Sequence, residues 1–224
     1  MASARIDSRY LFTDQFIAGA AAMARMAFAI ESKPLSDITE EDRTTHLSCV
    51  VSAIMQSVAA LETEIWDVLH HGPGHQLGSN GIAADARDFL YPTADLIDRQ
   101  NVLSRYAMTL HLLRKPPLDR SAQPWQDVSA LVSLRNELTH YKSHLGTELV
   151  RTKFLAALQV KNPTPPPFIP RNGVNFFPLQ CLSADRAAWA VEVTIAFIDK
   201  FCQHLGVPPR LAGYPTGMFV PRPT

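Results

Sequence analysis

Apolar residues recur at intervals of three and four along most of the chain, which is the spacing of amphipathic helices. The longest such pattern covers residues 39–71, where Thr39 and the three acids after it are typical of a helix start. Its apolar positions are Leu47, Val51, Ile54, Val58, Leu61, Ile65 and Val68. A seam of this length predicts a core helix that packs along another long helix.

A second continuous seam predicts the last helix, over residues 183–205. Ser183 supplies a capping hydroxyl, Asp185 lies in the first turn, and Gly206 with the prolines after it ends the helix. Its apolar positions are Ala188, Val191, Ile195, Ile198, Cys202 and Leu205. The pattern again favours a helix buried along one face.

Weaker patterns predict five further helices. An alanine-rich helix over residues 13–31, capped by Thr13, is expected to be a structural flank or a dimerisation element. The others are expected over residues 82–90, 94–114, 124–145 and 147–160, and proline or glycine ends the first three of these. The inward side of the 94–114 helix is expected to hold Leu96, Leu103, Tyr106, Leu110 and Leu113.

Alternating strand patterns are nearly absent, so the expected class is all-α, an antiparallel helical bundle. Only residues 174–177 could form a short strand or extended chain. The proline-rich connector at residues 161–170 is too short to imply a second domain. We therefore expect one domain over residues 1–206, with its core at about 40–205, an extra N-terminal helix, and an extended proline-rich tail at 207–224.

The composition is that of a soluble globular protein, with 46% hydrophobic and 19% charged residues in a chain of 224. Three cysteines without paired spacing predict buried thiols in a reducing cytosol. The apolar piece at residues 16–24 is too short to span a bilayer, so we expect a cytoplasmic protein without a membrane partner. His70, His71 and His75 flank a glycine-rich loop, which we interpret as solvent-exposed rather than metal-binding.

The charge is balanced overall but uneven along the chain. A net charge of zero argues against a dedicated DNA-binding protein. Residues 31–98 hold twelve acids and three bases, a net charge of −9, whereas residues 99–171 hold eleven bases and four acids, a net charge of +7. A modest basic region suits a short stretch of RNA better than a long duplex, although packing between neighbouring helices would also explain it.

The basic half contains the residues with the clearest chemistry, at 131–141. Leu131, Leu134 and Leu138 form an apolar stripe. Asn136 and His140 lie one turn apart on another face, and Arg135 lies between that face and the stripe. A permanent cation, an amide and an imidazole are the groups needed to bind a phosphodiester and to move a proton on it.

The Arg-Asn-x3-His pattern on a helix resembles the HEPN superfamily, whose all-helical domains carry an Arg-x4–6-His motif. The similarity of layout covers about residues 40–205, and the residue match is confined to 131–141. It implies a homodimer whose two motif helices share one cleft and cleave RNA without a metal or cofactor. Arg135, Asn136 and His140 would be the catalytic residues, with Tyr141 and Lys142 as auxiliary candidates.

The resemblance also implies possible roles and partners. The substrate would be single-stranded RNA attacked by its own ribose 2′-hydroxyl, and the protein would be a cytoplasmic toxin or defence effector. A nucleotidyltransferase-type antitoxin is a possible partner. Some toxin members carry a tyrosine two places after the histidine, whereas Tyr141 follows His140 directly.

Two alternatives remain open from the sequence. Many HEPN domains only bind nucleotides or partner proteins, and here Arg135 could pair with a carboxylate while His140 is merely exposed. A metal-binding helical bundle is the other alternative, because carboxylate–imidazole spacings occur twice. The residues concerned are Glu137, His140 and His144 in one helix and Asp67 and His70 in another. Such a bundle needs further inward-facing glutamates, which the other helices lack.

Overall fold

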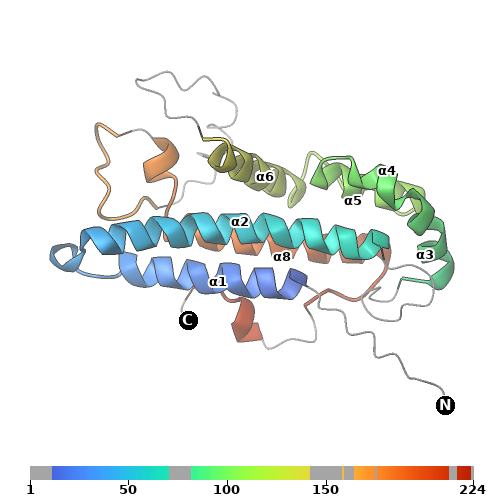
Figure 1. Ribbon diagram of the computed structural model, residues 1–224, viewed down its shortest axis with the longest axis horizontal. Coiled ribbons are helices and arrows are strands. Elements are labelled where there is room, and N and C mark those ends of the chain that lie inside the picture. Colours follow the sequence, from blue (N-terminus) through green and yellow to red (C-terminus); the bar gives the residue numbers. More distant parts are fainter. Residues whose placement is uncertain are drawn as a thin grey trace, which may run out of the picture.

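The computed structural model describes residues 12–70, 82–141, 158, 164–174, 176–211 and 216–222. Within these residues the protein is all-helical, as predicted, and it has no strand. Three long helices form its centre: α1 (Phe12–Glu31), α2 (Glu40–His70) and α8 (Ala184–Leu205). Both α1 and α8 pack along α2 and against each other (Figure 1).

The direction of each long helix follows from contacts along the bundle. The short turn η1 (Leu35–Asp37) joins α1 to α2, so these two helices run antiparallel. The Glu31 carboxylate accepts a hydrogen bond from the Ala184 N–H at 2.8 Å, which brings the start of α8 to the end of α1. Further along, the Thr194 hydroxyl donates to the Ser57 carbonyl at 3.3 Å. Helix α8 therefore runs parallel to α2.

The two predicted seams and their caps are confirmed, except at Leu47 of the first seam, which is 42% exposed. Thr39 accepts a hydrogen bond from the Asp42 N–H at 3.1 Å and starts α2. Ser183 accepts from the Arg186 N–H at 3.3 Å, and Gly206 adopts the left-handed conformation (φ 80°) that ends α8. Helix α2 is buried on more sides than its predicted seam, because α1 and α8 both cover it.

Helix α1 belongs to the core rather than to a flank. Its inner face includes a run of small side chains that are fully buried, which allows its backbone to approach α2 and α8 closely. These residues are Ala20, Ala21, Ala24 and Ala27. The core therefore begins at α1 and not near residue 40.

The helix expected over residues 94–114 is broken in two. The short α3 (Ala84–Leu90) and the turn η2 (Tyr91–Thr93) lead into α4 (Ala94–Asp98), and α5 (Val102–Leu112) follows. The Asn101 side chain accepts a hydrogen bond from the Ser104 N–H at 3.0 Å and so starts a new helix. The break changes the rotation of the first half, and Leu96 is 61% exposed instead of buried.

Helix α6 (Trp125–Thr139) packs on α2 and α8 but ends earlier than the predicted residue 145. His140 already departs from helical geometry, and the next ring, of Tyr141, lies 6.1 Å from that of Phe177 in η3 (Phe176–Gln180). This turn replaces the strand considered for residues 174–177. The helix expected over residues 147–160 lies outside the described residues, except for the buried, helical Leu158.

The described parts of the C-terminal tail, residues 207–211 and 216–222, pack on the bundle instead of extending from it. The tail includes the short turn η4 (Thr216–Phe219), which contacts α1, and Phe219 is buried. The Arg25 guanidinium donates to the Val220 carbonyl at 2.5 Å. The tail thus adds a surface to α1.

By length and composition alone, α2 could cross a membrane, since it contains an 18-residue window of mean hydropathy 1.3. Half of that window is buried inside the protein, and the core helices of globular proteins have the same character.

Candidate functional site

The apolar side of α6 fixes how the helix presents the motif. Leu131 and Leu134 are fully buried against α2 and α8, and Leu138 is partly buried. This rotation turns Asn136 and His140 outward, and it leaves Arg135 at the edge facing α2. The predicted placement of the three motif residues is therefore confirmed.

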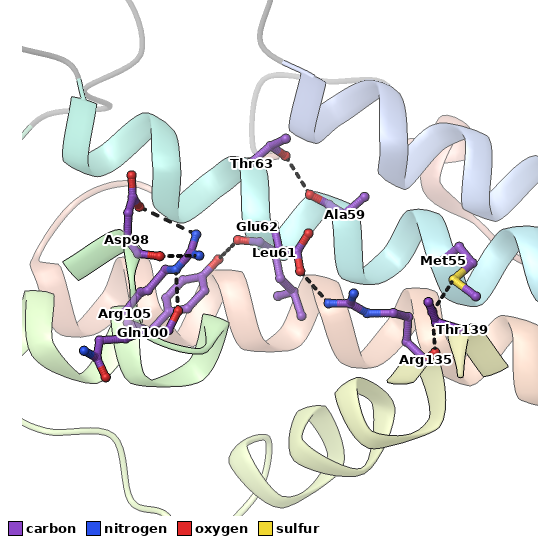
Figure 2. Close-up of polar contacts among 11 residues, drawn as sticks. Met55, Ala59, Leu61, Glu62, Thr63, Asp98, Gln100, Arg105, Arg135 and Thr139 are labelled. Carbon is purple, nitrogen blue, oxygen red and sulfur yellow. Dashed lines mark hydrogen bonds and ion pairs between the residues drawn. The ribbon is translucent and has the colours of Figure 1, made fainter. Parts of the chain in front are cut away.

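Arg135 is engaged by a carboxylate of α2. Its Nη2 atom donates a hydrogen bond to Glu62 Oε1, and Figure 2 shows the guanidinium pointing along α2 toward this residue. The two side chains are 26% and 43% exposed, so the ion pair is partly open to water. The Arg135 Nε atom is shielded and has no hydrogen-bond partner within the described residues. Within this chain, the charge of Arg135 is thus balanced by Glu62.

Asn136 and His140 are both exposed and neighbour each other at the end of the helix. The His140 N–H donates to the Asn136 carbonyl at 3.0 Å, which places the imidazole one turn from the amide. Among the described residues, neither side chain has a hydrogen bond or an ion pair. The amide and the imidazole are therefore open to a ligand.

Of the two auxiliary candidates, Tyr141 and Lys142, only Tyr141 lies within the described residues. Tyr141 is half exposed and lies beside Phe177, so its ring is at the edge of the surface that carries His140. Lys142 lies outside the described residues. The structure thus places Asn136, His140 and Tyr141 at one end of α6, with Arg135 turned aside toward α2.

Ion pairs between the acidic range 31–98 and the basic range 99–171 neutralise part of the uneven charge. Besides the Arg135–Glu62 pair, Arg105 of α5 lies beside Asp98 of α4 (Figure 2). The Arg105 Nη2 atom donates to the Asp98 carbonyl at 2.7 Å, and its Nη1 lies 3.6 Å from the carboxylate. Packing between helices therefore accounts for part of the asymmetry, as the alternative explanation anticipated.

The two sets of candidate metal ligands, one on α6 and one on α2, lie far apart. Thr139 Oγ1 lies 3.9 Å from Met55 Sδ, so the end of α6 is level with Met55 of α2. His70 is fifteen residues further along α2, about 22 Å at the rise of an α-helix, and pairs with Asp98. Within the described residues no group of three or more side chains could hold a metal ion. His71, His75 and His144 lie outside them.

A buried charged cluster was missed from the sequence. Arg210 Nε lies 3.0 Å from Glu64 Oε2 and 3.4 Å from Asp14 Oδ1, and all three side chains are at most 5% exposed. Burial raises the pKa of Glu64 to about 7, against the lowering effect of Arg210, and nearby Asp67 and Asp14 raise it further. Because the cluster is enclosed, its role is to hold the C-terminal segment against α1 and α2 rather than to bind a ligand. Its signal was Glu64, a carboxylate beside Leu61 and Ile65 on a core helix.

Comparison with known proteins adds no family to this site. No protein-family model matches the chain, and no curated protein or solved structure matches it either.

Proposed function

We propose that this protein is a metal-independent endoribonuclease of HEPN type that cleaves single-stranded RNA as a homodimer. The proposal rests mainly on one observation: Asn136 and His140 lie one turn apart, exposed and unengaged, at the end of a helix whose other side is packed in the core. A packed helix holds such groups in fixed positions, which catalysis requires.

The chemistry needs no group beyond RNA and these side chains. The 2′-hydroxyl attacks the adjacent phosphorus, the bond to the 5′-oxygen breaks, and the products are a 2′,3′-cyclic phosphate and a 5′-hydroxyl. His140 would take the proton from the attacking hydroxyl, and the same residue of the second protomer would supply one to the leaving oxygen. Asn136 would orient the phosphate, and Arg135 would offset the charge that develops on it.

Because Arg135 is paired with Glu62, RNA could use Arg135 only by displacing the Glu62 carboxylate. Its guanidinium would exchange the Glu62 carboxylate for a phosphate of the RNA, which is a stronger bidentate partner when the site is shielded from water. The two α6 helices of a dimer would face each other to give that shielding. The proposed wider role is that of a cytoplasmic toxin or defence effector, restrained by a nucleotidyltransferase-type antitoxin.

One observation favours a second candidate function. Because Arg135 is already paired with Glu62, the motif helix could serve as a scaffold in a HEPN-like module that binds nucleotides or proteins without cleaving RNA. In that case Arg135 would tether α6 to α2, and His140 would be a surface residue.

Cleavage of end-labelled single-stranded RNA separates the two candidates. We expect the wild-type protein to leave a 2′,3′-cyclic phosphate and to spare DNA, which lacks the 2′-hydroxyl. His140→Ala should lower the rate by about 10²–10⁴-fold, the contribution of a positioned acid or base. His111→Ala is the matched control, because His111 is an exposed histidine on α5 away from the motif. Equal cleavage by wild type and His140→Ala, both folded, would assign the activity to contamination.

A further inference from the structure

A groove outside the motif runs along the outer face of α8. It has a volume of about 810 Å³ and lies between α8 and the start of α6. Its apolar lining consists of Pro124, Trp189, Val193, Ala196, Val207 and Pro209. A second hollow of about 500 Å³ shares Glu192, Ala196 and Asp199 with it and extends it toward the C-terminal tail.

The groove is separate from the motif surface. On α6 its lining residue is Asp127, with Gln123 and Pro124 just before the helix. Asp127 precedes Arg135 by eight residues, about 12 Å along the helix, and none of the motif residues lines the groove. An occupant of the groove would therefore leave Asn136 and His140 uncovered.

Carboxylates line the groove on both walls. Glu192 and Asp199 are seven residues apart on α8 and so share one face, about 10 Å apart along the axis. Asp127 lies on the α6 side. The basic residue of the lining, Lys200, donates from its Nζ to Gln203 at 2.9 Å. The groove thus combines an apolar floor with a negative rim.

Asp199 has a distinct environment within this rim. It is partly buried, and within the described residues it forms no ion pair. Burial without a cation raises the pKa of its carboxyl group. A positive group placed beside Asp199 would stabilise its ionised form and so compensate for the hydration that burial removes.

The chain itself shows how this face accepts a cation. Arg222 of the C-terminal tail lies over the same row of acids, with Nη1 3.6 Å from Asp185 and Nε 3.8 Å from Glu192. Asp185, Glu192 and Asp199 follow each other at intervals of seven. Arg222 occupies one end of the row, and the end at Asp199 has no such partner among the described residues.

We propose that this groove docks a basic segment of a partner protein. An apolar side chain of that segment would lie on the floor beside Trp189 and Val193, and an arginine or lysine would pair with Asp199 and Glu192. RNA does not fit, because its phosphates would meet carboxylates. The proposal does not depend on the ribonuclease activity, since the motif residues lie elsewhere.

The test uses a short fluorescein-labelled peptide in which arginines alternate with leucines, and it measures binding to the full chain by fluorescence anisotropy. The double variant Glu192→Gln, Asp199→Asn should bind it at least about tenfold more weakly than wild type, and high salt should reduce the difference. Asp88→Asn, which removes an exposed acid on α3, is the control and should bind like wild type. Melting temperatures establish that each variant is folded.

Reversing the charges of both the peptide and the groove tests whether the binding is specific to these carboxylates. A peptide with glutamate in place of arginine should not bind wild type but should bind the variant Glu192→Lys, Asp199→Lys. Equal affinity of the arginine peptide for wild type and for the first double variant, or failure of the exchange in a folded protein, would overturn the proposal.

Discussion

At the scale of single residues, Glu62 decides what Arg135 can do. A partly exposed ion pair contributes little to stability, typically under about 1 kcal/mol, because water screens both groups. The same pair has a larger effect on ligand binding, because it cancels a charge that a phosphate would otherwise meet. The two candidate functions therefore differ most clearly in the effect of changing Glu62.

We expect Glu62→Gln to strengthen RNA binding and to leave the free energy of unfolding nearly unchanged. The change keeps a hydrogen-bond acceptor for Arg135 but removes the competing charge, so the affinity should rise by severalfold and depend more steeply on salt. Filter binding to single-stranded RNA at several salt concentrations measures this, with Glu137→Gln as a control on α6. A loss of stability without any gain in RNA affinity would favour the scaffold role of Arg135.

At the scale of elements, prediction from the sequence succeeded where local signals decide. The start of α2 and both ends of α8 lie within a residue of expectation, because Thr39, Ser183 and Gly206 act on their own helix ends. The end of α6 was misplaced because it coincides with a contact between Tyr141 and Phe177, which are distant in sequence. The outward position of Asn136 and His140 was foreseeable from periodicity, whereas the pairing of Arg135 with Glu62 depends on how α6 packs on α2.

The role of α1 was also beyond local signals, because an alanine-rich helix suits a core and a surface equally well. We expect Ala24→Leu to destabilise the protein by about 1–3 kcal/mol or more, since Ala24 is fully buried and a larger side chain must displace its neighbours. Ala29→Leu is the matched control, because Ala29 is exposed on the same helix. Urea unfolding of both variants tests this, and equal midpoints would mean that α1 is only a flank.

At the scale of the whole molecule, the C-terminal segment packs on the three-helix bundle and stabilises it. Arg210, beyond the end of α8, inserts between Asp14 of α1 and Glu64 of α2, so one side chain links three parts of the chain. Phe219 and the Arg25–Val220 contact hold the described residues 216–222 on the bundle. The region that proline content marked as an extended tail thereby contributes to the fold.

This arrangement predicts a large difference between the two arginines of the tail. Arg210→Met would leave Asp14 and Glu64 buried without their cation, and such a loss costs about 3–5 kcal/mol. Arg222→Gln should cost less than about 1 kcal/mol, because Arg222 is nearly half exposed and its ion pairs are long. Thermal unfolding at neutral pH compares them. Adding Asp14→Asn and Glu64→Gln to Arg210→Met should restore much of the lost stability, because the buried carboxyl groups that Arg210 balanced are then replaced by neutral amides. If Arg210→Met and Arg222→Gln melt together, the buried cluster does not hold the tail to the bundle.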